Sequence, residues 1–354
     1  MKFIHIADMH FDTPFTFLGE KENLGDIRRL EQREAFKKTI EYIKKEKIKY
    51  LFIAGDLYDQ KYVKKTTIEY INDLFKEIPE TKIFISPGNH DPFLKNSYYN
   101  EFEWNENVYI FNNEIGLYEF EDVDIYGFGF NDFYCNNFNV EEIKIKNIEK
   151  LNILVIHGDI DASKNADVLY NPLTNSELST LGFDYIAMGH IHKRQTINKN
   201  IVYPGSTVSL GFDEPGEHGM LEVNLEKNSL KISFIKLDSR EFIEQEFDTS
   251  EINTQEELIE KINGLNLEEN NMYKIILVGT RKFEIEKNKI LKLINKENIL
   301  KIKNNTKIKY NLEELSKQNN LKGIFVKEML ELLKNEPEKK EIIQDALEIG
   351  LYNM

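Results

Sequence analysis

The chain has 354 residues, of which 41% are hydrophobic, and it carries a formal net charge of −15. This length accommodates one large domain and a smaller part, with enough apolar residues for a sizeable core. The acidic balance excludes general electrostatic attraction to nucleic acid, unless bound cations supply positive charge locally.

The single cysteine, Cys135, cannot form an intramolecular disulfide and indicates a reducing compartment. The N-terminal stretch MKFIHIADMHFD contains Asp8, His10 and Asp12, where a secretory signal would be apolar. No stretch reaches the roughly 18 uncharged apolar residues of a membrane helix. We therefore expect a soluble, cytoplasmic protein.

Short apolar runs alternate with helical patterns along residues 1–238, which predicts a layered α/β domain. The predicted strands are 3–7, 50–54, 83–86, 123–128, 153–156, 185–188, 201–203, 220–223 and 230–237. Helices are predicted at 27–47 and 64–77. The late strands lie close together in the sequence, and we expect them to form an antiparallel or mixed second sheet. The result would be a sandwich covered by helices.

The composition changes near Asp238, beyond which Lys, Glu, Asn and Ile dominate. A strand at 273–279 between helical patterns at 254–263 and 285–295 predicts a small α/β domain over 239–309. The segment 310–354 is predicted to be helical, with helices at 311–333 and 337–349 split at Pro337. Its apolar face either folds onto the chain's own small domain or docks a partner's coiled coil. That face contains Leu312, Leu315, Ile324, Met329, Leu332 and Leu333.

Polar clusters follow directly on five of the predicted strands and contain five of the seven histidines. In chain order they read ADMH (7–10), AGDLYD (54–59), PGNHD (87–91), IHGD (156–159) and MGHIH (188–192). Ligands of open α/β sheets bind at the carboxyl ends of the strands, so we expect these clusters to meet at one edge. Each cluster alone is also typical of a plain strand-end turn, but the ordered set favours a metal site.

Seven side chains of these clusters are candidate metal ligands: Asp8, His10, Asp56, Asn89, His157, His190 and His192. Residues i and i+2 of an extended segment point the same way, so Asp8 with His10, and His190 with His192, can each face one site. Carboxylate, amide and imidazole groups without a thiolate suit a borderline-to-hard divalent metal. Seven ligands suit two ions about 3.5–4 Å apart that share a carboxylate, as in phosphoesterases and nucleases.

Polar residues outside the five clusters are less specific indicators of function. His5 alternates with apolar residues and is expected in the core, whereas His218, in the turn EPGEHGM, is expected at the surface. Lys193 and Arg194 directly follow His192 and are candidate substrate-binding residues. The lysines 61, 64 and 65 are further candidates for contacting phosphate, and a solvated surface explains each of these cations equally well.

The ordered motifs D-x-H, G-D-x-x-D, G-N-H-D, H-G and G-H-x-H resemble the calcineurin-like metallophosphoesterase superfamily. The longer matches HIADMHFDTPF, IAGDLYD, PGNHDP, MGHIHKRQ and VYPGS are similar to SbcD-type DNA repair nuclease subunits, particularly the YhaO-like branch. The resemblance covers residues 1–238 strongly. It implies a four-layer αββα nuclease domain there, a small capping domain, two manganese ions and cleavage of DNA phosphodiesters. It also implies a homodimer bound to an SMC-like ATPase with long coiled coils.

The resemblance also assigns roles to the clusters. Asp8, His10 and His192 would hold one metal, and Asn89, His157 and His190 the other, with Asp56 bridging. His90 would face the scissile phosphate as a general acid or phosphate stabiliser, with Asp91 orienting its ring. The sequence departs from the family at Asp59, where many SbcD-type nucleases have histidine. This change removes a candidate contact to the DNA strand, and we expect Asp59 to hold a metal ligand in place.

Two further functions remain compatible with these residues. The substrate can be a nucleotide or another small phosphodiester, because one fold hosts many substrates. The chain can also be a scaffold that mainly binds an ATPase, which the complete ligand set disfavours.

Overall fold

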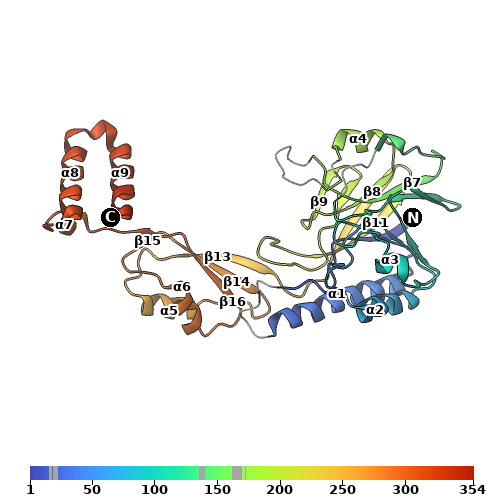
Figure 1. Cartoon of the computed structure of the whole chain (residues 1–354), viewed down its shortest axis with the longest axis horizontal. Coiled ribbons are helices and arrows are strands. Elements are labelled where there is room, and N and C mark those ends of the chain that lie inside the picture. Colours follow the sequence, from blue (N-terminus) through green and yellow to red (C-terminus); the bar gives the residue numbers. More distant parts are fainter. Residues whose placement is uncertain (16–17, 19–22, 135–139, 162–169, 172) are drawn as a thin grey trace. The chain divides into compact units, whose positions relative to one another are not determined.

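A computed structural model describes residues 1–15, 18, 23–134, 140–161, 170–171 and 173–354 (Figure 1). Cys135, on which the redox expectation rests, lies outside the described residues. The chain divides into two compact units. The larger comprises residues 1–244 with 268–273, and the smaller comprises 245–267 with 274–354.

The first sheet of the larger unit has six strands in the order β12-β11-β1-β2-β3-β4. Their bounds are β1 Lys2–Ile6, β2 Tyr50–Ile53, β3 Lys82–Ile85, β4 Val108–Ile110, β11 Gly219–Glu226 and β12 Ser229–Lys236. Strands β1 to β4 are mutually parallel, and β11 pairs antiparallel with β1. The carboxyl ends of β1, β2 and β3 therefore lie side by side at one edge.

The second sheet also has six strands, in the order β5-β6-β7-β8-β10-β9. Their bounds are β5 Gly116–Glu119, β6 Val123–Phe128, β7 Leu151–His157, β8 Tyr185–Gly189, β9 Gln195–Asn198 and β10 Ile201–Tyr203. The four central strands β6, β7, β8 and β10 are parallel, while β5 and β9 pair antiparallel at the edges. The ends of β7 and β8 thus also lie side by side.

The two sheets pack face to face around an apolar core. Side chains alternate along β1, so that Phe3 enters the core between the sheets and Ile4 packs toward the helices. Phe3 makes edge-to-face contacts with Phe52 of the same sheet at 4.9 Å and with Tyr185 of the opposite sheet at 5.1 Å between ring centroids. Phe84 joins the same core. This packing holds the two sets of strand ends against each other.

Helices cover the outer faces of the sandwich. In Figure 1, α1 (Leu24–Glu46) and α2 (Lys65–Lys76) lie below the sheets, and the short α4 (Asn175–Thr180) lies above them. The outer layer on the second sheet also contains the 3-10 helix η2 (Val140–Glu142), and α3 (Tyr98–Glu101) precedes β4. The αββα layering inferred from the sequence is confirmed, with the layer over the second sheet built largely from loops.

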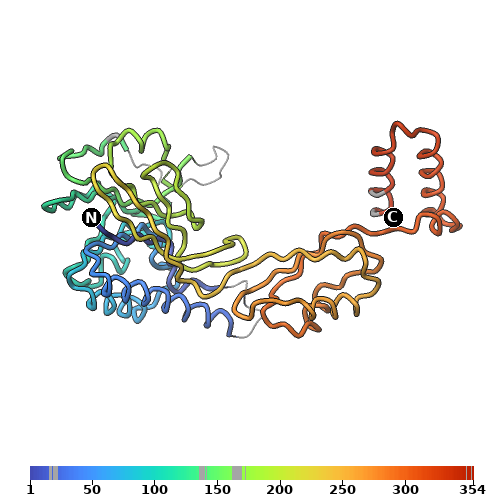
Figure 2. Tube along the Cα trace, turned by 180° about the vertical axis from the view of Figure 1, so that it is seen from behind, coloured from blue at the N-terminus to red at the C-terminus, as the bar shows by residue number. Residues whose placement is uncertain are grey.

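A three-stranded sheet in the order β13-β14-β16 has its first residues of β13 and β14 in the larger unit and the rest in the smaller unit, which also has a two-stranded sheet of β15 and β17. Their bounds are β13 Phe242–Asp248, β14 Met272–Val278, β15 Thr280–Arg281, β16 Ile299–Asn304 and β17 Lys307–Ile308, with helices α5 Gln255–Asn263 and α6 Lys287–Leu293. A helical part follows, comprising α7 Leu312–Leu315, α8 Leu321–Asn335, the 3-10 helix η3 Pro337–Lys339 and α9 Lys340–Asn353. Figure 2 shows α8 and α9 side by side as an antiparallel hairpin.

The structure corrects two expectations about these elements. Strands β11 and β12 were expected in a second sheet, but they extend the first sheet from its β1 edge, because β11 pairs with β1 along its length. The helix expected over 311–333 is two helices, α7 and α8. Its break follows from Asn320, whose side chain accepts the Gly323 amide and starts a new helix.

Candidate metal centre

All seven candidate ligands lie at the carboxyl ends of five parallel strands. Asp8 and His10 follow β1, Asp56 follows β2, Asn89 follows β3, His157 ends β7, and His190 and His192 follow β8. The first sheet supplies four of them and the second sheet three. The site exists because the two sheets pack with these edges aligned.

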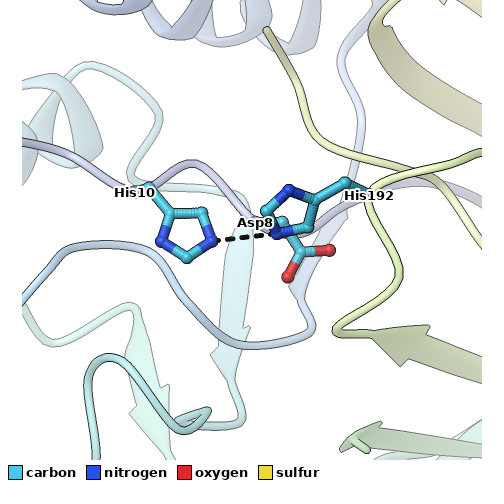
Figure 3. A group of neighbouring side chains, drawn as sticks. All are labelled: Asp8, His10 and His192. Atoms are coloured by element: carbon cyan, nitrogen blue, oxygen red, sulfur yellow. Dashed lines mark hydrogen bonds between the residues drawn. The ribbon is translucent and has the colours of Figure 1, made fainter. Parts of the chain in front are cut away.

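Asp8, His10 and His192 form one group, in which one ligand atom of each residue lies within 4.8 Å of the others (Figure 3). The Nε2 atoms of His10 and His192 face each other at 3.1 Å. Nδ1 of His192 hydrogen bonds to Oε1 of Glu214 at 2.5 Å. Burial alone would lower the pKa of His192, but the hydrogen bond to Glu214 raises it to about 9.

Asn89, His157 and His190 form a second group around one atom. Oδ1 of Asn89 lies 3.0 Å from Nε2 of His157 and 3.2 Å from Nδ1 of His190. Nδ1 of His157 donates to the Ala54 carbonyl at 2.9 Å, which directs Nε2 toward the group. Burial would lower the pKa of His157, but the charge of Asp56 raises it to about 9.

Asp56 lies between the two groups. Its Oδ2 is 3.6 Å from Nε2 of His10 and 3.4 Å from Nε2 of His157, and Oδ1 accepts the backbone amide of His90 at 2.8 Å. Burial would raise the pKa of Asp56, yet the nearby charge of His157 lowers it well below its usual value. One histidine of each group, His10 and His157, therefore faces the same buried carboxylate.

These residues fit a pair of divalent cations. The Nε2 atoms of His10 and His192 face each other, and Nε2 of His157 faces the amide oxygen of Asn89. Two hydrogen-bond acceptors repel each other at such distances, so a proton or a cation must lie between the atoms of each pair. The raised pKa values of His157 and His192 favour the protonated imidazoles where no cation neutralises the nearby carboxylates. Metal binding releases such protons, because a ligating imidazole is neutral.

Backbone strain concentrates at the same positions. Asp8, His10, Asp56 and His190 have φ values of 53°, 48°, 51° and 107°, in a region that residues other than glycine rarely adopt. The segment 8–10 is therefore not the extended segment expected from the spacing. Gly88 is required nearby because a Cβ there would lie on Asp56, within 2.9 Å of its backbone nitrogen.

His90 stands beside this centre with about half of its side chain exposed. Its Nδ1 lies 2.6 Å from Oδ1 of Asp59, and the ring also contacts that of His10 edge-to-face at 4.6 Å. A nitrogen of His90 groups with His10 and Asp56 within 4.8 Å. Burial opposes protonation, but the hydrogen bond to Asp59 raises the pKa of His90.

The prediction that Asp91 orients the ring of His90 is wrong. Asp91 is fully buried, and its carboxylate accepts the backbone amides of Asp56, Leu57 and Gly88 at 3.0, 2.6 and 2.7 Å. It also accepts the Tyr99 hydroxyl at 2.6 Å. These four donors occupy the lone pairs of Asp91, which therefore stabilises the loops that follow β2 and β3. Asp59 is the carboxylate that orients His90.

Glu214 is a further residue of the site, and sequence reasoning missed it. Besides contacting His192, its carboxylate accepts Ser206 Oγ at 3.0 Å and the Leu210 amide at 2.8 Å. Burial would raise the pKa of Glu214, but the hydrogen bond from His192 lowers it. The Pro-Gly turn that follows marks only a loop, so no local signal identifies this carboxylate.

Two remaining histidines also differ in their surroundings. His5 is buried in the core, as expected, with Nδ1 3.0 Å from the Tyr185 hydroxyl. His218, expected at the surface, is only 5% exposed. Its ring nitrogens contact Ser206 at 2.9 Å and the Glu214 carbonyl at 3.0 Å. These two contacts tie the His218 ring to Ser206 and to the residue that holds His192.

The candidate substrate-binding cations lie in varied surroundings. Arg194 stacks on the Phe234 ring of β12, with 3.7 Å from the guanidinium carbon to the ring centroid. Lys193 is exposed. Lys65 pairs with Glu69 on the surface of α2 at 3.5 Å, and the Lys64 amide donates to Asp12. Lys61 lies 5.6 Å from the centroid of Phe133, close to His90 in the same pocket.

The family model for calcineurin-like phosphoesterases matches residues 1–194, which is more than half of the chain and spans all seven candidate ligands. The chain therefore belongs to the calcineurin-like phosphoesterase family, whose members are metal-dependent phosphoesterases. Its sandwich is the metallophosphoesterase fold, with candidate metal-binding groups at the expected edge.

Two curated proteins are similar to this chain. "Uncharacterized metallophosphoesterase YhaO" of Bacillus subtilis strain 168 is 27% identical over 246 residues, which cover 66% of this chain and 60% of that protein. The D subunit of the SbcCD nuclease of Staphylococcus epidermidis is 29% identical over 270 residues, covering 65% of this chain and 67% of that protein. The matches thus span about two thirds or less of either relative.

Solved structures show more distant similarity. GAP50, titled the anchor in the inner membrane complex of Plasmodium, overlaps with a TM-score of 0.42 at 15% identity, covering 68% of this chain and 85% of that one. The protein TT1561 of Thermus thermophilus overlaps with a TM-score of 0.38 at 11% identity, covering 66% and 98%.

The sequence predicts no membrane-spanning helix. In the described part of the chain, none combines the length and the apolar composition that a membrane crossing requires.

Proposed function

We propose that this protein is a two-metal phosphodiesterase that hydrolyses DNA, as the nuclease subunit of a complex with an SMC-like ATPase. The observation that carries the proposal is the position of Asp56 between the two groups, with Oδ2 at 3.6 Å from Nε2 of His10 and 3.4 Å from Nε2 of His157. The similarity to a protein named as part of the SbcCD nuclease supports DNA as the substrate.

The proposed ligands divide between two ions. Asp8, His10 and His192 hold one, Asn89, His157 and His190 hold the other, and Asp56 bridges them. We propose Mn²⁺ in both positions, because mixed carboxylate, amide and imidazole ligands without thiolate suit it. Two cations held there would neutralise charge on the phosphate and activate a water molecule as the nucleophile.

His90 is the proposed general acid or phosphate stabiliser. Asp59 holds Nδ1 of the ring and favours its protonated form, which lets the imidazolium donate to a phosphate oxygen or to the leaving oxygen. The half-exposed ring can meet a substrate that enters from solvent. Asp91 supports the chemistry indirectly, by fixing the loops that carry Asp56 and His90.

DNA cleavage by the purified chain with Mn²⁺ tests the proposal. Single-stranded, hairpin and plasmid DNA are assayed beside bis(p-nitrophenyl) phosphate, with and without the cognate ATPase. We expect hydrolysis of DNA, a loss of at least about a hundredfold in His90→Ala with both metals retained, and loss of metal in Asp56→Asn. A His90→Ala variant that loses its metals would instead make His90 a ligand.

The same assay separates the two alternative functions. Hydrolysis of the chromogenic diester or of nucleotides without any DNA cleavage would indicate a small-molecule phosphodiesterase. No hydrolysis of any substrate, alone or with the ATPase, would indicate a scaffold.

The proposed ATPase contact is the hairpin of α8 and α9. Its apolar core is Val326, Met329, Ile343, Leu347 and Leu351, yet large apolar side chains also remain on its surface. Those that are more than half exposed are Leu321, Ile324, Ile342 and Ile349. Such residues suit a helical partner laid along the hairpin.

A co-purification experiment tests this contact and the proposed homodimer. Replacing Ile324 and Ile342 by serine should abolish co-elution with the ATPase while the larger unit keeps its diesterase activity. Sedimentation of the unmodified chain measures its oligomeric state, and a monomer at all concentrations contradicts the dimer.

A further inference from the structure

A pocket of about 300 Å³ opens directly beside the metal centre. Asn89 and His90 line it, so it is continuous with the groups proposed to hold the metals and the phosphate. Much of the remaining lining is aromatic, from Tyr62, Phe133 and Tyr134, with Tyr170 on the same wall. The volume is at the lower end of the range for small-ligand sites.

Two aromatic rings of the pocket, those of Tyr134 and Tyr170, form a stacking surface, here called the platform. Tyr134 and Tyr170 are stacked, with 6.0 Å between ring centroids and 19° between planes. Tyr170 continues to His190 at 5.1 Å, which links the platform to the metal centre. Tyr134 nevertheless remains 60% exposed. An exposed ring already aligned with a second ring offers a flat apolar face to a planar ligand.

The position of the platform selects the ligand. A nucleotide whose phosphodiester lies at the metal centre carries a planar base one sugar unit away, and such a base matches the platform beside His190. Base-on-aromatic stacking tolerates any base, because every base has a π-face. A base inside a duplex has both faces covered by its neighbours, so the platform takes a base with a free face, as in a single strand or at a strand end.

The charge of the protein makes such stacking important. The net charge of −15 works against binding of a polyanion. Lys61, at 5.6 Å from the Phe133 centroid, adds a cation at the pocket. Stacking contributes affinity that does not depend on net charge, and it acts only on the nucleotide beside the scissile bond.

We infer that the pocket walled by Phe133, Tyr134 and Tyr170 binds a nucleobase with a free face, adjacent to the scissile phosphate. This inference rests on the proposed phosphodiesterase function and adds to it a subsite for one base of the substrate.

Dinucleotides with a single phosphodiester bond test the inference, because their cleavage point is unambiguous. Thymidylyl-thymidine is compared with analogues in which either thymine is missing, leaving a tetrahydrofuran sugar. With Mn²⁺, we expect removal of one of the two bases to lower kcat/KM about tenfold. In Tyr134→Ala this ratio between substrates should fall toward one, and in Tyr134→Phe it should persist. Ile148→Ala, which removes a 71% exposed side chain elsewhere in the same unit, should leave the ratio unchanged.

A binding measurement gives a readout independent of turnover. A dinucleotide with 2-aminopurine and an uncleavable methylphosphonate link should lose fluorescence on binding, because stacking quenches that base. Quenching by the unmodified chain that disappears in Tyr134→Ala supports the pocket, and absence of quenching overturns it.

The two proposals fail in different ways. Equal hydrolysis of all dinucleotides overturns the base pocket and leaves the phosphodiesterase intact. No hydrolysis of any dinucleotide or DNA overturns the proposed function, and the quenching experiment then decides the pocket alone.

Discussion

One carboxylate oxygen, Oδ1 of Asp59, faces Nδ1 of two histidines, at 3.4 Å from His10 and 2.6 Å from His90. Asp59 therefore holds a proposed metal ligand and the proposed acid at once. The side chain is 7% exposed and its pKa is lowered: burial would raise it, but hydrogen bonds from both histidines lower it. A single residue thus couples metal binding to the proton donor.

Replacing Asp59 by asparagine should lower kcat on a phosphodiester by about tenfold or more, because a neutral amide no longer favours the protonated form of His90. Steady-state kinetics and the manganese content of the purified variant are the measurements. Asp73→Asn, which alters an exposed carboxylate paired with Lys76 on α2, is the control and should behave as the parent. An unchanged kcat in Asp59→Asn would remove Asp59 from the mechanism.

Glu214 supports the first ligand group in the same manner, through Nδ1 of His192. Glu214→Gln should weaken Mn²⁺ binding about 10- to 100-fold, the usual effect of losing a carboxylate behind a ligating histidine. Isothermal titration calorimetry measures the affinity. Glu217→Gln, three residues away and 52% exposed, is the matched control. Equal affinities in both variants would show that Glu214 does not position His192.

At the scale of elements, helix α1 is fastened to the first sheet by a buried ion pair. The guanidinium of Arg28 is fully buried and donates to both carboxylate oxygens of Asp238, at 3.0 and 2.9 Å, just after β12. It also donates to the Ser209 carbonyl at 2.8 Å. Ser209 belongs to the loop that carries Glu214, so this contact joins α1, the end of β12 and the metal-site loop.

Arg28→Ala should destabilise the larger unit by about 3–5 kcal/mol, because Asp238 would remain buried without its partner. Denaturant unfolding followed by circular dichroism measures the change. The neighbouring Arg29 pairs with Asp26 at the surface and is 31% exposed. Arg29→Ala should therefore change stability by less than about 1 kcal/mol. Similar losses in the two variants would contradict a special role for the buried pair.

At the scale of the whole molecule, the candidate metal centre joins two sheets whose main contact is an apolar core, with hydrogen bonds such as that between His5 and Tyr185. The first sheet supplies Asp8, His10, Asp56 and Asn89, and the second supplies the other three ligands. Two metal ions bound by these ligands would therefore link the two halves of the sandwich. The folded state alone presents the complete set of ligands, so metal binding must stabilise it.

Mn²⁺ at a hundredfold excess over its dissociation constant should stabilise the chain by about 2.7 kcal/mol, and EDTA should reverse the effect. Thermal unfolding of the larger unit with and without metal is the measurement. Asp56→Asn should show little or no stabilisation by Mn²⁺, because both ions lose a shared ligand. Equal stabilisation of the variant would place the bound metal elsewhere.

Several features of the fold could be predicted because they are local. Apolar runs with charged helical patterns between them identify β1, β2, β3, β6, β7 and β8. Polar residues that end parallel strands must meet at one edge, so the seven candidate ligands could be named before any coordinates. Strands β4, β5 and β9 escaped prediction, since they are short edge strands without clear alternation.

The amino-acid sequence was sufficient to identify the strand ends, the ligand types and the family. The packing of the folded chain selected the partners: Asp59 rather than Asp91 for His90, Glu214 for His192, and β1 for β11. Those pairings join residues far apart in the chain, across loops whose paths depend on how the two sheets pack. Periodicity and spacing describe one segment at a time, so they place a side chain at an edge without showing which neighbour it meets there.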